Sequence, residues 1–220
     1  MNNPTVQTAR HAGAVEVNKV LRNTYTLLAL SLAFSAMVAG ISGALNLPHP
    51  GLIITLVGFY GLLFAIHKTA NSGAGIAFVF ALTGFMGYTI APYLNMIVAN
   101  GGADIVMLAM GGTALIFFAL SAYILTTKKD MSFLGGMMVA GFVVILVGFV
   151  ANLFLNLPAL GLALSALFIL FSAGAILMQT SAIVNGGERN YILATTTLFV
   201  SIYNIFVSLL NLLMAFGGDE

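Results

Sequence analysis

The stretch YILATTTLFVSIYNIFVSLLNLLMAF, residues 191 to 216, decides the fold class of this chain. It carries no charged side chain and exceeds the ~20 residues that an α-helix needs to cross a bilayer. Unpaired amides in hydrocarbon cost several kcal/mol, so the polar face of such a helix should turn towards other helices. The segment therefore predicts a membrane-spanning helix at the centre of a bundle. Its polar residues recur at steps of four and three along one helix face: Thr197, Ser201, Asn204, Ser208 and Asn211.

The rest of the chain has the same apolar character. Hydrophobic residues make up 60% of it and charged residues 6%, whereas soluble domains carry about 25% charged residues. Short turn-like links separate seven apolar segments and leave no room for a further domain. The prediction is an all-α integral membrane protein with seven transmembrane helices, the last one central. The predicted spans are 24–45, 51–67, 75–98, 104–126, 132–155, 159–179 and 191–216.

The positions of the basic residues predict the orientation of the chain. If the seven spans alternate in direction, every Lys and Arg falls on one side of the membrane, and basic residues favour the cytoplasmic side. The N-terminus is then cytoplasmic and the C-terminus external. We expect a flexible basic tail over 1–22, a transmembrane domain over 23–216 and a short external tail over 217–220. The basic residues are Arg10, Lys19, Arg22, Lys68, Lys128, Lys129 and Arg189.

Residues missing from the predicted spans argue against several chemistries. The chain has no cysteine, and no Asp, Glu or Lys lies in a span interior. Its three histidines, His11, His49 and His67, lie in the tail or at helix ends, with no spacing suited to a shared metal. We therefore expect neither an enzyme nor a bound cofactor. The mild basicity follows from membrane topology and predicts contact with lipid, and it gives no reason to expect nucleic acid binding.

The sixth span carries a second polar row. Ser165, Ser172 and Gln179 repeat at steps of seven and so share one helix face. An antiparallel hairpin centred near residue 188 would set residues at one depth where their numbers sum to about 376. Ser165 then lies level with Asn211, Ser172 with Asn204, and Gln179 with Thr197. Two interpretations stay open: helix-to-helix hydrogen bonds, and a polar pore or substrate site.

Six short segments match a known pattern. They are LRNTY (21–25), PGLIITLVG (50–58), KTAN (68–71), GGTALIFF (111–118), SAYILTTKKDMSFLGGM (121–137) and SIYNIFVSLL (201–210). Over residues 19 to 216 the chain resembles the Bax inhibitor-1 family. The resemblance implies a seven-helix fold whose last helix is surrounded by the other six. Its bacterial inner-membrane members further imply binding to the protease FtsH and its associated membrane proteins, engagement through the N-terminal tail, and degradation by that protease.

The resemblance also bears on Gln179. Acid-sensing members, linked to calcium leak, carry carboxylates in motifs like ILxDT and LxLDxxN, which fall here on ILMQT (176–180) and LFVSIYN (198–204). Gln179 and Ser201 therefore stand where those members have acids, and neither titrates. This favours a non-enzymatic modulator and substrate of FtsH over the alternative, an ion leak or channel of the calcium or proton type. A transporter of a small polar solute is a weaker third reading, and a homo-oligomer stays open.

Overall fold

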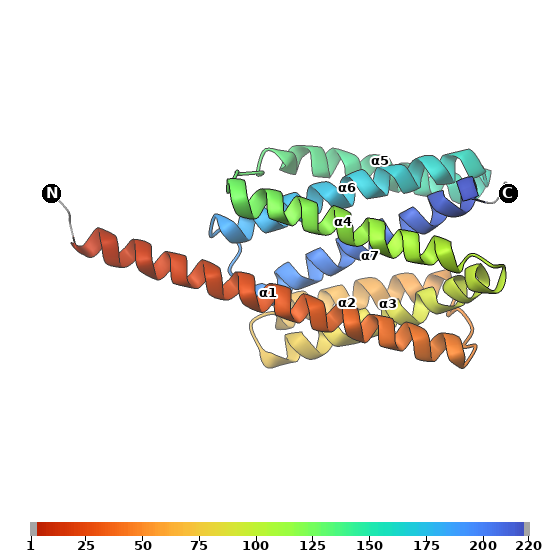
Figure 1. Cartoon of the computed structure of the whole chain (residues 1–220), viewed down its shortest axis with the longest axis horizontal. Helices are drawn as coiled ribbons and strands as arrows, with labels where there is room; N and C mark the ends of the chain where they lie inside the picture. The colour runs from red at the N-terminus through yellow and green to blue at the C-terminus, as the bar shows by residue number, and fades with distance from the viewer. Residues whose placement is uncertain (1–3, 218–220) are drawn as a thin grey trace. The chain divides into compact units, whose positions relative to one another are not determined.

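A computed structural model describes the backbone of residues 4–217 and the side chains from Val15 to Gly217. Its seven helices, and no strand in that range, confirm the predicted fold class (Figure 1). Each helix contains a stretch long and apolar enough to cross a membrane. In chain order they are α1 (Pro4–Ala44), α2 (Leu52–Thr69), α3 (Gly73–Ala99), α4 (Ala103–Thr127), α5 (Leu134–Leu155), α6 (Pro158–Val184) and α7 (Tyr191–Gly217).

The first helix begins well before its predicted span. α1 starts at Pro4, whereas the apolar pattern placed its start at Thr24. The apolar pattern marks only the part of a helix that lipid surrounds. Between Val15 and Asn23, upstream of the predicted span, no Gly or Pro interrupts the helix. The backbone of residues 4–22 therefore belongs to α1. The flexibility of the tail stays a prediction, and residues 1–3 and 218–220 lie outside the described range.

The sixth helix also continues past its predicted end. It was expected to stop at Gln179, but α6 runs to Val184, so that Gln179 lies inside the helix. The stop comes instead at the two glycines that follow. Gly186 adopts a left-handed φ of 77°, and the Gly187 N–H donates to the Ala182 carbonyl at 2.8 Å. Such a left-handed glycine is a common way to end an α-helix.

The helices divide into two compact units. Unit 1 consists of Met1–Pro92 and Ala182–Phe199, which covers α1, α2, most of α3 and the beginning of α7. Within it, α1 and α3 approach closely, because a Cβ at Gly87 would collide with the Ser35 carbonyl oxygen. The rings of Phe34 and Phe80 meet edge to face nearby, with centroids 5.4 Å apart. Small residues at such contacts allow helix backbones to pack tightly in a membrane.

Unit 2 consists of Tyr93–Ser181 and Val200–Glu220, which covers α4, α5, most of α6 and the rest of α7. Glycines again lie at its helix contacts. A Cβ at Gly148 of α5 would lie 2.7 Å from Cδ2 of Leu164 in α6. A Cβ at Gly112 of α4 would lie 3.2 Å from Cδ1 of Leu209 in α7. α7 thus contributes to both units, while its central place in the bundle remains a prediction.

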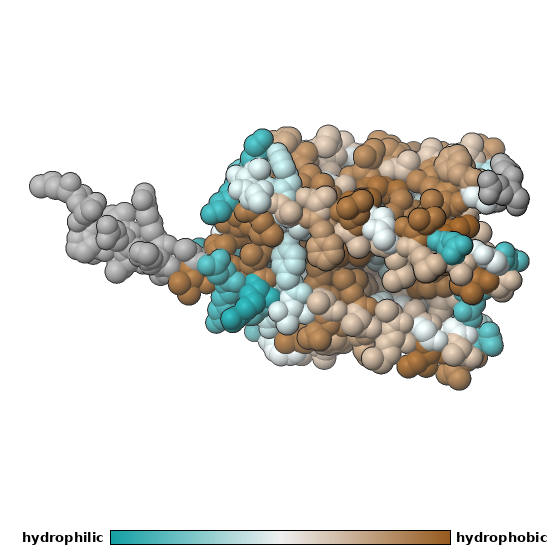
Figure 2. All heavy atoms as spheres, in the orientation of Figure 1, coloured by the Kyte–Doolittle hydropathy of each residue, from teal (hydrophilic) through white to brown (hydrophobic). Residues whose placement is uncertain are grey.

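Apolar side chains cover the outward surfaces of the helices. In Figure 2 the visible surface is mostly hydrophobic along the helices, and hydrophilic residues gather near the helix ends. Phe118 of α4 is 65% exposed and Phe154 of α5 is 82% exposed, which would be costly in water. In lipid such side chains lie in their preferred solvent, so this surface fits a membrane-spanning protein.

Candidate functional site

The polar rows predicted on the last two helices fall largely within unit 2. That unit holds the whole α6 row and the part of the α7 row from Ser201 onwards, whereas Thr197 belongs to unit 1. The serines of both rows are at most 5% exposed, which agrees with the expectation that these faces turn away from lipid. The row residues in unit 2 are Ser165, Ser172, Gln179, Ser201, Asn204, Ser208 and Asn211.

One pair of the two rows forms a direct hydrogen bond. Nδ2 of Asn211 donates to Oγ of Ser165 at 3.4 Å, at the pair of positions predicted for an antiparallel hairpin. The network extends to α3, since the Tyr93 hydroxyl donates to Oδ1 of Asn211 at 2.6 Å. Ser165 in turn donates to the Gly161 carbonyl at 3.1 Å. At this depth the row connects three helices.

The middle pair, predicted to lie at one depth, forms no hydrogen bond. Ser172 is 1% exposed, and its hydroxyl has no hydrogen-bond partner within the described range. It therefore does not bond to Asn204, although the two residues occupy matching positions in the predicted hairpin. Residue numbering predicts depth along the hairpin, but it does not fix the distance between side chains that a hydrogen bond requires.

Gln179 also departs from its predicted contacts. We expected its amide to bond to Thr197 or Ser201, but its Nε2 atom is buried and donates to no described residue. Burial of the amide nitrogen agrees with the expectation that this side chain avoids lipid. The predicted hydrogen bond from this nitrogen is wrong, because equal depth on two helices does not bring a donor and an acceptor within hydrogen-bonding distance.

The chemistry of these rows is that of amides and hydroxyls. Among the side chains that the structure describes, Val15 to Gly217, no three His, Cys, Asp or Glu come close enough together to hold a metal ion. Amides and hydroxyls do not ionise near neutral pH, whereas a switching site needs groups with responsive pKa values. The buried unpartnered groups of Ser172 and Gln179 can instead accommodate water or another small polar molecule.

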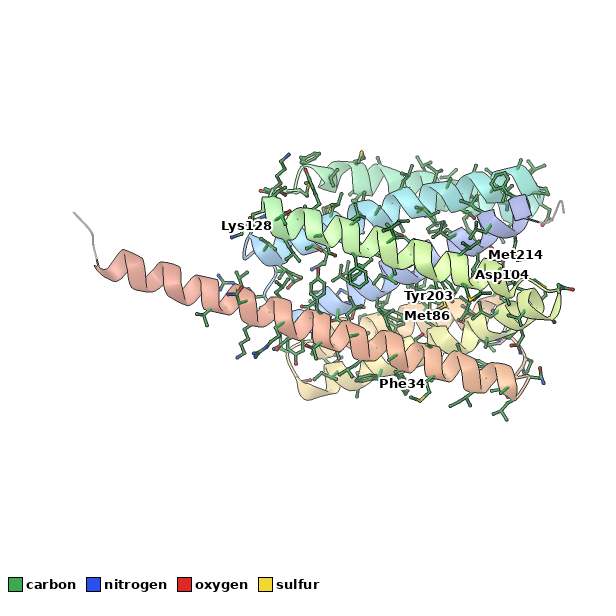
Figure 3. The ribbon with its side chains drawn as sticks, viewed as in Figure 1. Phe34, Met86, Asp104, Lys128, Tyr203 and Met214 are labelled. Atoms are coloured by element: carbon green, nitrogen blue, oxygen red, sulfur yellow. The ribbon has the colours of Figure 1, made fainter. Side chains whose placement is uncertain are left out.

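Within each unit, the basic residues whose side chains are described lie near one end of the helices. In unit 1 the Arg189 guanidinium lies 4.0 Å from the Glu16 carboxylate, and Asn190 donates to the Ala70 carbonyl next to the α2 end that carries Lys68. In unit 2, Lys128 and Lys129 follow α4. Figure 3 shows Lys128 at one end of α4 and Asp104 at the other end. The side chain of Arg10 lies outside the described part. Which side faces the cytoplasm stays a prediction.

A serine that the sequence analysis did not single out fixes the loop between α4 and α5. Oγ of Ser181 donates to the Lys129 carbonyl at 2.9 Å and accepts from the Met131 N–H at 3.0 Å. Lys128 adopts a left-handed φ of 52° at the end of α4. The Ser181 contacts span some fifty residues of sequence, and no local periodicity could have indicated them.

Asp130, in the same loop, has a perturbed acidity. Its Oδ1 accepts a hydrogen bond from the Ser132 N–H at 2.8 Å. Hydrogen bonds from the Ser132 backbone and, to a lesser extent, its side chain lower the pKa of Asp130 below the ordinary value of 3.8, because they stabilise the charged carboxylate. The carboxylate is therefore ionised throughout the neutral range.

Asn190 is the second residue that the sequence analysis missed. Its Oδ1 accepts from the backbone N–H groups of Ile192 and Leu193 and so caps the start of α7. Its Nδ2 donates to the Ala70 carbonyl and to Oδ1 of Asn71, both at 3.0 Å, and thereby ties the α2–α3 link to α7. An Asn just before an apolar run is a capping signal that could have been read from the sequence.

Seven apolar helices with buried rows of hydroxyls and amides define a multi-pass α-helical membrane protein. Residues 17–218 match the family described as "Inhibitor of apoptosis-promoting Bax1". The chain belongs to this Bax inhibitor-1 family, which confirms the resemblance seen in the sequence motifs.

Several bacterial relatives are similar over almost their whole length. The chain is 62% identical to "Modulator of FtsH protease YccA" of Escherichia coli, over 90% of this chain and 91% of that protein. It is 55% identical to a protein of Pasteurella multocida over 92% of both chains. It is 56% identical to one of Pseudomonas aeruginosa over 93% of both chains.

Proposed function

We propose that this chain is a non-enzymatic protein of the bacterial inner membrane that binds and modulates the protease FtsH. The observation that carries the proposal is the 62% identity, over 90% of the chain, to a relative named as a modulator of that protease. A second relative of the same identity is named as an inner membrane protein. The family is named for an inhibitor and the first relative for a modulator, and neither name is that of an enzyme.

We further propose that the chain is itself a substrate of FtsH and that the protease engages the N-terminal segment. An ATP-driven protease has to grip a segment that lies outside the bilayer. The links between helices are short, whereas residues before the α1 span offer a longer segment. The orientation predicted from the basic residues places this segment in the cytoplasm.

The contacts of α1 in unit 1 suggest why such a substrate would occupy the protease. Val20 is buried against Ile183 and Ala194, and Glu16 lies 4.0 Å from Arg189. Pulling on the N-terminus would have to break these contacts before the first span could leave the membrane. A slowly extracted substrate keeps the protease from other membrane proteins, which is the modulation we propose.

Pulse-chase measurement of protein half-life, in cells with and without FtsH, tests the proposal. Deletion of residues 2–13 should lengthen the half-life in cells that contain FtsH, while the contacts of Glu16 and Val20 stay intact. A matched control replaces residues 2–13 with a Gly/Ser segment of equal length. If length alone matters, the control is degraded like the full chain. Equal half-lives for the full chain and the deletion would contradict the tail proposal.

Purification in mild detergent tests the partnership separately. We expect FtsH and its associated membrane proteins to co-purify with the full chain and to be lost when the tail is deleted. Co-purification that survives the deletion would show that the membrane helices bind FtsH. Its absence from the full chain would contradict the proposed partnership.

An ion leak is the second candidate function, and one observation favours it. The Ser172 hydroxyl and Gln179 Nε2 are buried without partners in one row of α6, where water or an ion could lie. The lack of a carboxylate in either row argues against calcium, which prefers carboxylate oxygens. We expect reconstituted protein to give little calcium flux and no steep pH dependence between about pH 6 and 8.

Two double variants provide the test in liposomes. Gln179→Glu with Ser201→Asp places acids at both motif positions and should introduce a pH-dependent leak. Gln179→Glu with Ser208→Asp carries the same added charge, with the second acid seven residues further along α7, and should not. Strong calcium flux from the unmodified protein would favour the ion-leak function over FtsH modulation.

A further inference from the structure

A depression with an acidic side chain at one end lies on an exposed face of α4. Its volume is about 460 Å³, and Asp104, Met107, Leu108, Gly111 and Gly112 line it. These residues follow one another at steps of three, one, three and one, so they form a stripe along the helix. Figure 3 shows Asp104 at one end of α4.

A missing side chain creates the floor of this depression. A Cβ added at Gly111 would meet no atom within 4 Å, so the space above this glycine is open. Met107 and Leu108 form the walls and are 62% and 63% exposed. Gly112, at one edge of the depression, faces Leu209 of α7, so this edge borders the packing contact within unit 2. The exposed residues Met107 and Leu108 lie on the side of the depression that opens towards the lipid.

Asp104 gives the depression its charge. It lies in the first turn of α4, where the helix dipole favours a negative side chain. Among the described residues it forms no ion pair, because the contact between Arg189 and Glu16 is the one ion pair found there. With a rise of 1.5 Å per residue, its Cα lies about 10 Å along the helix from that of Gly111. A carboxylate at the membrane boundary thus stands above an apolar hollow.

We propose that this depression binds a phospholipid with a primary-amine headgroup, phosphatidylethanolamine. The headgroup ammonium pairs with the Asp104 carboxylate, and one acyl chain lies over Gly111 between Met107 and Leu108. Opposite charges attract at this site, whereas a lipid with net negative charge is repelled by the carboxylate. The depression is formed at one glycine on one helix, so a single acyl chain fits it better than a protein helix does, because a helix presents a broad face. The proposal is independent of FtsH.

Lipid retention by the purified full chain tests the site. The protein is equilibrated in detergent with equal amounts of phosphatidylethanolamine and phosphatidylglycerol, and native mass spectrometry counts the bound lipids. The unmodified protein should retain the amine lipid over the anionic one by about two- to fivefold, as expected for an exposed ion pair. Asp104→Asn should reduce this ratio to about one.

A second pair of variants tests the hollow itself. Gly111→Leu fills the floor and should lower retention of the amine lipid at least about twofold, because the chain loses its apolar contact. Gly136→Leu is the matched control, since Gly136 of α5 is also exposed and has no atom within 4 Å of an added Cβ. The control should bind lipid like the unmodified protein. Equal thermal midpoints for both variants would show that each is folded.

Three outcomes would overturn the proposal. The first is equal retention of the two lipids by the unmodified protein. The second is a preference for the amine lipid that survives Asp104→Asn, or retention that survives Gly111→Leu. The third is crosslinking to a protein. A photoreactive residue placed at position Leu108 should label lipid in native membranes, and crosslinking to a protein would show that a partner helix occupies the depression.

Discussion

Asn211 of α7 donates a hydrogen bond of 3.4 Å to Ser165 of α6, and it accepts a shorter one, of 2.6 Å, from Tyr93 of α3. The side chain of Asn211 thus uses both its donor and its acceptor across helices. In a membrane such contacts contribute roughly 0.6 kcal/mol each on average. The network therefore stabilises unit 2 where the rows of α6 and α7 meet.

We expect Asn211→Leu to lower the free energy of unfolding by about 1 to 2 kcal/mol, because both bonds are lost and the Tyr93 hydroxyl keeps only the weak acceptor Sδ of Met214, at 3.6 Å. Ser165→Ala should cost less, about 0.5 kcal/mol, since between helices it removes only the longer bond, and its bond to the Gly161 carbonyl lies within α6. Unfolding by SDS titration in mixed micelles measures both values. If Ser165→Ala is the more damaging change, the network does not carry the stability assigned to it.

Ser181→Ala should loosen the loop between α4 and α5. The substitution leaves the Lys129 carbonyl and the Met131 N–H without their partner, and an unpaired buried group costs about 1 to 3 kcal/mol. Trypsin cleavage after Lys128 or Lys129 should then accelerate at least about fivefold.

Thr126→Ala is the control for this variant. The Thr126 hydroxyl is exposed and bonds only within its own helix, to the Ala122 and Tyr123 carbonyls. Its loss should leave the cleavage rate nearly unchanged. Cleavage of Ser181→Ala at the unmodified rate would show that the loop is held by other contacts.

Asn190→Ala should destabilise unit 1, because it removes the α7 cap together with the bonds to Ala70 and Asn71. A lost cap costs about 1 kcal/mol, and the lost cross-links add about 1 kcal/mol more. Asn190→Asp keeps the acceptor that caps α7 but loses the donor. Its free energy of unfolding should therefore lie between that of the unmodified protein and that of Asn190→Ala. Equal unfolding midpoints for Asn190→Asp and Asn190→Ala would leave the cap without a measurable role.

The acidity of Asp130 predicts a change confined to low pH. Its pKa in the folded chain lies below the ordinary value of 3.8, so its bond to Ser132 stabilises the loop above that value. The contribution is lost as pH falls through the lower, folded pKa. An NMR titration of the Asp130 carboxyl carbon should give a midpoint below 3.8. With Ser132→Pro, which removes the N–H donor, the midpoint should rise; an unchanged midpoint would contradict the assigned cause.

Gln179→Met should leave stability unchanged or raise it by up to about 1 kcal/mol. The buried Nε2 atom has no partner among the described residues, so removing it relieves an unpaired polar group while Met keeps much of the volume. The same SDS titration measures the effect. A clear loss of stability would indicate that ordered water satisfies the amide, as buried polar sites often require.

The sequence predicted the fold class and much of the polar rows for a simple reason. Helix length and helical periodicity are local properties, and hydrocarbon tolerates few alternatives to the helix. Turn residues between the segments then set the hairpin of α6 and α7, which is why the pairing of Ser165 with Asn211 could be predicted from their numbers.

The errors also have physical reasons. The apolar pattern measures where lipid begins, and a helix can extend beyond that point, as α1 does to Pro4 and α6 to Val184. The bond predicted for Gln179 failed because equal depth does not ensure contact between side chains. The Ser181 contacts depend on residues about fifty positions away, a relation that no local pattern contains.

The division of the chain has a consequence for biosynthesis. Unit 1 takes its first part from residues up to Pro92 and its last part from Ala182–Phe199. The ribosome must therefore add 199 − 92 = 107 further residues before unit 1 can be completed. At typical elongation rates this takes roughly 5 to 20 seconds. During that time the first three spans lie in the membrane without the part of α7 that completes unit 1. We expect a newly made chain to be most open to proteolysis in this interval.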